Sequence, residues 1–111
     1  MPVIVTLPLI RNKRDLTQEQ LAELAQRSQQ LIGKLEQQKA KGIGFDTLSQ
    51  LLEAVDATGI EDAIVYIPND PTKLDDTLAR LSQRFGVPVD YLLPYIPEDL
   101  KEAYRKQYTL N

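Results

Sequence analysis

Apolar residues recur at helical spacing in two short runs between residues 16 and 39, and a polar break separates the runs. Each run can bury one face against the other. The pattern predicts two short helices joined by a tight turn, with the spacing of a helix-turn-helix. The first apolar stripe consists of Leu16, Leu21, Leu24 and Ala25, and the second of Ile32 and Leu35.

Polar residues mark where both helices begin. Thr17 is a candidate N-cap with Gln20 three residues later, which is the pattern of a capping box. Ser28 is a candidate N-cap of the second helix. Gln29 and Gln30 then fall in the first turn of that helix, where a helix that enters a DNA groove presents side chains to base edges.

Three further helices are expected downstream. Asp46–Val55 has apolar residues at helical spacing behind an Asp cap, and Asp70 followed by Pro71 begins a longer helix that ends at Gly86. A last amphipathic helix is predicted over residues 97–108. The buried stripe of the longer helix is expected to be Leu74, Leu78, Leu81 and Phe85.

Two β-branched apolar runs, at residues 3–7 and 64–67, can form short strands that pair. The segment between these strands also has a counterpart later in the chain. The same residue types recur 30 positions later, since Asp46, Thr47, Leu48 and Leu51 correspond to Asp76, Thr77, Leu78 and Leu81. This is either an internal repeat or two ordinary capped helices, and either segment could complete a core with the helix-turn-helix.

Composition narrows the function. The chain has 111 residues, no Cys and no His, so it lacks thiolate chemistry and the commonest metal ligand and general base. Adjacent acids occur near helix starts, where capping explains them. We therefore expect no enzyme, cofactor or metal. No segment has the length of a signal peptide or a membrane span, so a cytoplasmic protein without membrane contact is expected.

The net charge of −3 is unevenly distributed. Residues 10–42 carry a local charge of +3, because seven cations (Arg11, Lys13, Arg14, Arg27, Lys34, Lys39, Lys41) outnumber four acids (Asp15, Glu19, Glu23, Glu36). The rest of the chain carries −6. A basic end can contact phosphate while an acidic end stays clear of it, although a small imbalance can also arise by chance.

The segment LTQEQLA is followed by Ser28, Ile32, Lys34, Leu35, Glu36 and Lys39. Together these residues resemble the Cro/C1 (Xre) family of bacterial and phage repressors, and the similarity extends over this stretch without an insertion or deletion. The resemblance implies that Gln18 contacts a phosphate and braces the recognition helix, and that Gln29 and Gln30 read bases. A Gln amide can bond adenine N6 and N7 together, so an adenine-containing half-site is implied. Lys34 would face the groove or a phosphate.

The chain departs from the family pattern in the turn and in the second helix. Gln26 stands where the family has a Gly with positive φ, and Arg27 replaces a small apolar residue, so its side chain is expected to extend to the surface. Gly33 weakens the second helix. Its benefit could be that a backbone approaches the helix closely at this position. Gln38 replaces a C-capping Gly, which could defer the helix end to Gly42.

The sequence therefore predicts a mainly α protein, a bundle of five to six helices with a Cro/C1-type helix-turn-helix and room for a short two-stranded β element. Residues 1–15 are assigned to an N-terminal arm, 16–67 to the DNA-binding domain, and 68–111 to a helical appendage for dimerisation. The expected base-reading residues are Gln29, Gln30 and Lys34, and the expected phosphate-binding residues are Arg11, Lys13, Arg14, Gln18, Lys39 and Lys41.

The expected function is sequence-specific binding of double-stranded DNA by a repressor-like homodimer. Two alternatives remain at this stage. One is a protein-interaction module that kept the scaffold and lost DNA binding, and the other is an antitoxin-type protein that also masks a toxin. The operator sequence, the regulated genes and any effector are beyond the reach of the sequence.

Overall fold

The computed structural model describes residues 3–109, with side chains described as far as Lys106. These residues form two compact units. One spans Val5–Val65, and the other contains the chain from Tyr66 onward together with the residues that precede Val5. The predicted fold class is confirmed, since the regular structure of the described residues consists of six α-helices, three short 3₁₀ helices and a small two-stranded sheet.

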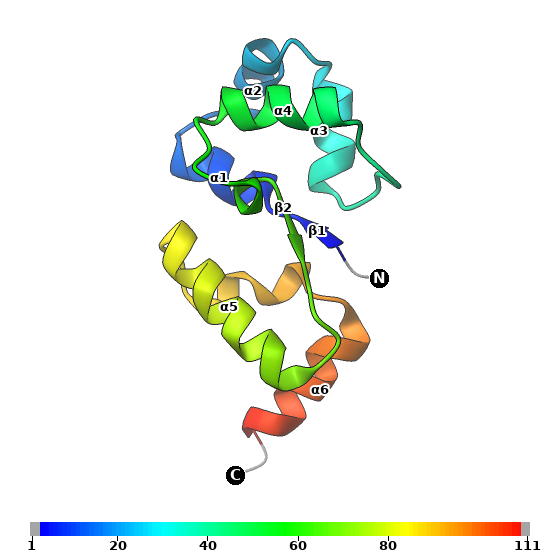
Figure 1. Ribbon diagram of the computed structural model, residues 1–111, viewed down its shortest axis with the longest axis vertical. Coiled ribbons are helices and arrows are strands. Elements are labelled where there is room, and N and C mark those ends of the chain that lie inside the picture. The colour runs from blue at the N-terminus through cyan, green and yellow to red at the C-terminus, as the bar shows by residue number, and fades with distance from the viewer. Residues whose placement is uncertain (1–2, 110–111) are drawn as a thin grey trace. The chain divides into compact units, whose positions relative to one another are not determined.

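The N-terminal unit contains four α-helices in chain order (Figure 1). They are α1 (Leu7–Lys13), α2 (Gln18–Ala25), α3 (Gln29–Glu36) and α4 (Phe45–Ala54), and a short 3₁₀ helix, η1 (Ile60–Asp62), follows. Its core is made by aliphatic side chains that the four helices bury almost completely, as their periodicity requires. They include Leu7, Ile10, Leu21, Ile32, Leu51 and Val55.

The two predicted strands form and pair. β1 (Val3–Val5) and β2 (Ile64–Tyr66) make an antiparallel two-stranded sheet. Ile4 and Val65 are buried, whereas Val3 and Tyr66 are exposed. Successive side chains of a strand point to opposite faces, so one face of this small sheet is covered and the other is open.

The segment assigned from sequence to an N-terminal arm is placed differently by the structure. Its residues 7–13 form α1, and Leu7, Pro8, Leu9 and Ile10 are buried. Thr6 ties the start of this helix to η1, because its backbone N–H donates to the Ala63 carbonyl at 2.8 Å and its hydroxyl donates to the Glu61 carbonyl at 2.9 Å. An apolar run of this length contributes more free energy in a core than it would in a solvated arm.

The first five α-helices end in the same way. At the end of each helix, one residue adopts the left-handed backbone conformation. The N–H of the residue after it donates to the carbonyl five residues earlier, which is the hydrogen bond of a Schellman motif. Only the last of these residues is a glycine. The residues are Asp15 (φ 57°), Gln26 (φ 56°), Gln38 (φ 62°), Asp56 (φ 53°) and Gly86 (φ 66°).

Gln26 thus adopts the positive φ that was expected for its position. The expected end of α3, in contrast, is corrected by the structure. The Lys39 N–H donates to the Lys34 carbonyl at 3.0 Å around Gln38. The helix therefore stops at Glu36 and is not extended toward Gly42. Gln38 accepts the left-handed conformation, so no glycine is needed to end the helix.

Two further expectations from sequence are wrong. The N-cap of α4 is Gly44, and Asp46 lies in the first turn, where its charge favours the helix dipole without capping it. Leu24 is 58% exposed and does not join the buried stripe of α2. It lines an open hollow of about 340 Å³ between α2 and α4 together with Ala25, Gln26, Gln50, Glu53 and Ala54.

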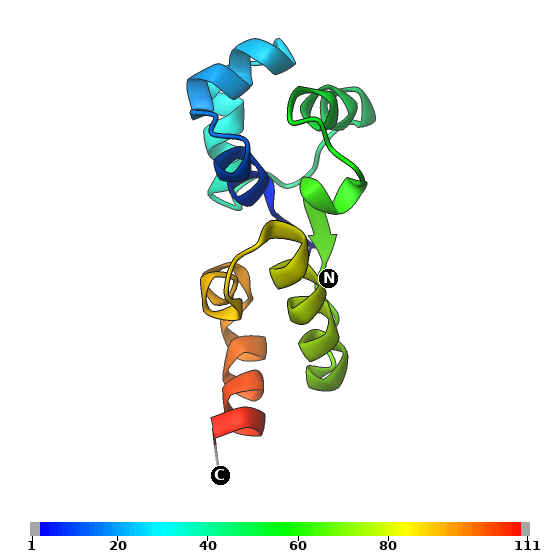
Figure 2. The ribbon, with the colours of Figure 1, turned by 90° about the vertical axis from the view of Figure 1, so that its left-hand side faces the viewer.

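The C-terminal unit is built on the long helix α5 (Pro71–Phe85), which begins and ends as predicted. The Asp70 carboxylate accepts the Thr72 N–H at 3.0 Å, and hydrogen bonds from the Thr72 side chain and backbone hold the pKa of Asp70 below its usual value. The 3₁₀ helices η2 (Val89–Tyr91) and η3 (Leu93–Tyr95) lead into α6 (Glu98–Thr109), which lies beside α5 (Figure 2).

The two similar sequence segments also share an order of elements, in which a helix with a left-handed end precedes a 3₁₀ helix. The Ala57 N–H donates to the Leu52 carbonyl at 2.9 Å, and 30 residues later the Val87 N–H donates to the Ser82 carbonyl at 3.2 Å. A 3₁₀ helix follows each turn. The first segment completes the helix-turn-helix core, because α4 packs against α2 within the N-terminal unit.

Candidate nucleic-acid interface

Side-chain caps fix where α2 and α3 begin. The Thr17 hydroxyl accepts the Gln20 N–H at 3.0 Å, and the Gln20 amide oxygen accepts the Thr17 N–H at 2.9 Å, so the predicted capping box is confirmed. The Ser28 hydroxyl accepts the Leu31 N–H at 3.1 Å and caps α3 as predicted. Ser28 and the left-handed Gln26 together set the tight turn that orients α3 against α2.

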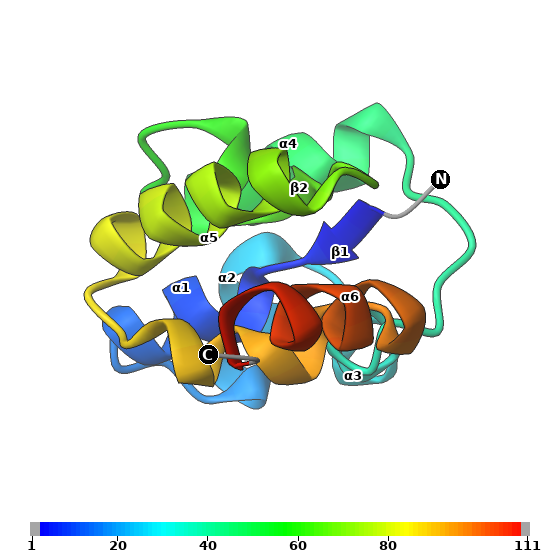
Figure 3. The same cartoon turned by 90° about the horizontal axis from the view of Figure 1, so that it is seen from below.

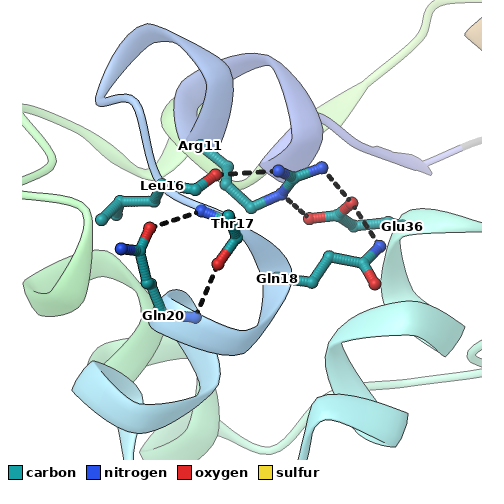
Figure 4. A network of polar contacts seen from close by, with 6 residues as sticks. All are labelled: Arg11, Leu16, Thr17, Gln18, Gln20 and Glu36. Carbon is teal, nitrogen blue, oxygen red and sulfur yellow. Dashed lines mark hydrogen bonds and ion pairs between the residues drawn. The ribbon is translucent and has the colours of Figure 1, made fainter.

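A polar network joins α1, α2 and α3 through one carboxylate (Figure 4). Glu36 accepts two hydrogen bonds from the Arg11 guanidinium, at 2.7 Å from Nε and 2.9 Å from Nη2. The Gln18 amide nitrogen donates to the same carboxylate at 2.9 Å. Arg11 Nη1 also donates to the Leu16 carbonyl at 2.9 Å, in the connection between α1 and α2.

This network is shielded from water. The side chains of Arg11 and Glu36 are only 16% and 6% exposed. A paired guanidinium and carboxylate satisfy each other in such a place, whereas either charge alone would be costly. Gln18 therefore contacts α3, as the resemblance implies. Arg11, which the sequence assigns to phosphate binding, bonds to Glu36 and to the Leu16 carbonyl in this structure. Glu36, whose role the sequence analysis did not assign, is the centre of the network.

The exposed face of α3 carries the predicted base-reading residues. Gln29, Gln30 and Lys34 are exposed, while Ile32 and Leu35 are buried on the opposite side. Three long polar side chains therefore project from the first turns of a capped helix. A Gln amide carries a donor and an acceptor, and a Lys ammonium donates only, so the face can bond to base edges and to phosphate.

An extended loop joins α3 to α4 (Figure 3). Lys39 and Lys41 of this loop are exposed. The loop is anchored at its start by Gln38, whose amide donates to the Val5 carbonyl at 2.9 Å and accepts the Val5 N–H at 2.8 Å. The side chain of Gln38 thus pairs with β1 much as a neighbouring strand would.

The other two predicted phosphate contacts lie at the end of α1. Arg14 donates from Nε to the Val55 carbonyl at 2.8 Å and from Nη2 to the Asp56 carbonyl at 3.1 Å. It thereby satisfies carbonyls at the C-terminus of α4, where a cation is electrostatically favoured. Lys13 is exposed and makes an interaction of its own within the chain.

Arg27 lies in the turn between α2 and α3. It is half-buried, and its Nε is buried without a hydrogen-bond partner among the described residues. Its side chain is therefore not simply extended into solvent as expected from the sequence. An unpartnered buried donor costs free energy, so this substitution in the family turn is unfavourable for stability.

Within residues 3–109, no three His, Cys, Asp or Glu side chains gather as a metal ion would require. No helix in this range combines the length and the apolar character of a membrane span.

The geometry agrees with the comparison with protein families. The sequence model of the Cro/C1-type helix-turn-helix DNA-binding domain matches residues 6–69, which covers α1–α4, η1 and β2. The chain belongs to this family, and its N-terminal unit is a DNA-binding helix-turn-helix domain. No curated protein and no solved structure matches the sequence significantly.

Proposed function

We propose that this chain is a sequence-specific, repressor-like transcriptional regulator that reads the major groove with Gln29, Gln30 and Lys34. The observation that carries the proposal is the exposure of all three side chains at the start of α3, behind the Ser28 cap. A recognition helix contacts base edges with its N-terminal residues. The buried face of the same helix is held by the core, so the readers are presented on a fixed support.

The chemistry of these side chains favours particular bases. A Gln amide bonds well to adenine, because its oxygen accepts from N6 and its nitrogen donates to N7. Lys34 donates to guanine O6 and N7 or to a nearby phosphate. We therefore expect adenine within the half-site opposite the Gln pair, with a less strict preference opposite Lys34.

We assign the phosphate contacts to three exposed lysines and to the half-buried Gln18. Lys39 and Lys41 are exposed in the loop after α3, and Lys13 is exposed at the end of α1. The Gln18 amide spends one N–H on Glu36 and keeps a second one for a phosphate. We assign Arg11 and Arg14 to the scaffold, because their guanidinium groups bond inside the domain.

One small domain contacts too few base pairs for strong specificity, so we propose that two copies act on half-sites about one helical turn apart. The C-terminal unit, which lies outside the family match, would then supply the homodimer contact.

The decisive experiment selects bound sequences from random duplex DNA, first with the wild-type chain and then with Gln29→Ala/Gln30→Ala. The double variant should fold normally, because both residues are exposed, and should lose about 1–3 kcal/mol of discrimination per bidentate contact. Gln83→Ala, which removes an exposed Gln from α5, is the matched control and should keep the wild-type preference. An unchanged preference in the double variant would exclude the Gln pair as readers.

A second candidate is a protein-interaction module, including an antitoxin that masks a toxin. It is favoured by the net charge of −3 and by the internal hydrogen bonds of Arg11 and Arg14, which occupy N–H donors that would otherwise be available to phosphate. Absence of DNA binding at low salt would favour this module. A toxin-like reading frame beside the gene would favour the antitoxin.

A further inference from the structure

Gly33 lies in the middle of the exposed face of α3. At about 100° per residue, Gly33 is about 40° around the helix from Gln29 and about 60° from Gln30, between the two and one turn later. Gly33 itself is half-buried, and the neighbouring Lys34 is exposed. The proposed base-reading face of α3 therefore consists of long polar side chains that surround one position without a side chain.

Nothing in the described part of the chain, residues 3–109, requires a glycine at position 33. Gly33 does not have a positive φ, and a Cβ built at this position meets no atom within 4 Å. Alanine is a better helix former than glycine, because glycine loses more conformational entropy on folding. The close approach expected from the sequence is thus not to another part of this protein, and the fold gains nothing from the missing side chain.

We propose that Gly33 is an affinity- and specificity-determining residue, whose missing side chain leaves a notch that a thymine methyl group fills when α3 lies in the major groove. This inference rests on the proposed function. Backbone N–H groups inside a helix are already hydrogen-bonded, so the notch offers only the Cα hydrogens and the aliphatic parts of neighbouring side chains. The thymine C5-methyl is the apolar group that base pairs present in the major groove.

A side chain at position 33 would hold α3 away from the base pairs. Gln29 and Gln30 precede it by four and three residues, so the same displacement would lengthen the hydrogen bonds that they make to bases. Hydrogen bonds weaken steeply when distance and angle depart from their optimum. Gly33 therefore sets the depth at which the Gln pair reads the groove.

The test uses the full-length chain with Gly33→Ala and the DNA site selected by the wild type. The variant should unfold a few degrees higher, because α3 gains a better helix former. It should nevertheless bind the site roughly 5- to 150-fold more weakly, the range for loss of one bidentate base contact. Asp56→Gly is the control. It relieves a left-handed residue after α4, so it should raise stability without lowering DNA affinity.

Replacing each thymine of the site with deoxyuracil, one at a time, identifies the methyl group. The wild type should lose affinity at one position in each half-site, and Gly33→Ala should be indifferent to the same replacement. Wild-type indifference at every thymine would overturn the inference, as would equal affinity of Gly33→Ala and wild type. If the wild type selects no sequence at all, the proposed function fails first, so the two failures are distinguishable.

Discussion

Four residues with side chains occupy a backbone conformation that favours glycine. Asp15, Gln26, Gln38 and Asp56 each end a helix of the N-terminal unit with a positive φ. The left-handed conformation brings Cβ close to the following carbonyl oxygen and costs about 1 kcal/mol or more. The DNA-binding unit is therefore less stable than its topology allows, and the effect of relieving this strain can be measured.

We predict that Gln26→Gly raises the free energy of unfolding by about 1 kcal/mol, because glycine adopts a φ of 56° without a Cβ penalty. Urea unfolding followed by circular dichroism measures the change. Gln38→Gly is the matched control. It relieves the same strain but removes two hydrogen bonds to Val5, so it should give no gain. Equal stabilisation by both variants would show that the Gln38 amide contributes nothing.

A comparison of Arg14 with Lys39 tests the distinction that we propose between structural cations and phosphate-binding cations. We predict that Lys39→Ala lowers the log–log salt slope of DNA binding by about 0.9 and leaves stability nearly unchanged. Arg14→Ala should instead lower stability by about 1 kcal/mol, because α4 loses donors to its last carbonyls, and should leave the salt slope unchanged. A reduced slope for Arg14→Ala would restore the phosphate contact expected from sequence.

The difference between these two cations could not be read from the sequence. Arg11 and Arg14 lie in the basic segment that also contains Lys39, and local spacing gives no sign that their partners are Glu36 and the end of α4. A long side chain reaches many possible partners, and the one it finds depends on how distant segments pack. The positions of Gln29 and Gln30, the proposed base-reading residues, were easier to predict, because they directly follow the capping residue Ser28.

At the scale of elements, α3 depends on a single carboxylate. Glu36 stands in the last turn of this helix and bonds to both α1 and α2. Because the recognition helix has only eight residues, it would be marginal in isolation and relies on such tertiary contacts. The Glu36 network therefore determines how firmly the reading face is held.

We predict that Glu36→Gln lowers the free energy of unfolding by about 2–4 kcal/mol, because it leaves the shielded Arg11 guanidinium without a counter-charge. Chemical denaturation measures the loss. Glu23→Gln makes the same chemical change at an exposed position of α2 and should alter stability by less than about 0.5 kcal/mol. Similar small effects in both variants would mean that the network is only a surface contact.

Three helix starts were predicted correctly from short polar caps, whereas the start of α4 was not. Thr17, Ser28 and Asp70 are caps in the structure because a short polar side chain before an apolar stripe can satisfy the first free N–H groups. No glycine marks the ends of α1 and α4, where Asp15 and Asp56 have a positive φ. Gln38 also stands where a glycine would mark the end of α3, so the sequence suggested that this helix could continue toward Gly42. Where Gly86 is present, the end was predicted correctly.

At the scale of the molecule, the chain joins a family domain to a unit that repeats part of it. The family match ends at residue 69, whereas the helix, turn and 3₁₀ helix of α4 and η1 recur in α5 and η2. The sequence left open whether this similarity is an internal repeat or two ordinary capped helices. It also could not tell which segment completes the core, because both have a similar apolar spacing. The C-terminal unit is thus free to serve another role, for which we propose dimerisation.

We predict that Tyr91→Asp weakens a homodimer that the wild type forms at tens of micromolar. Tyr91 is 63% exposed in the C-terminal unit, and exposed aromatic residues are enriched in interfaces. Sedimentation should show a smaller species for the variant. Its affinity for an operator with two half-sites should fall, because linked half-sites bind at high effective concentration. The preferred base sequence of each half-site should stay the same. Phe45→Asp, which changes an exposed aromatic residue of the N-terminal unit, should leave the dimer intact. A monomeric wild type, or a Tyr91→Asp variant that stays dimeric and binds its operator undiminished, would refute this role for the C-terminal unit.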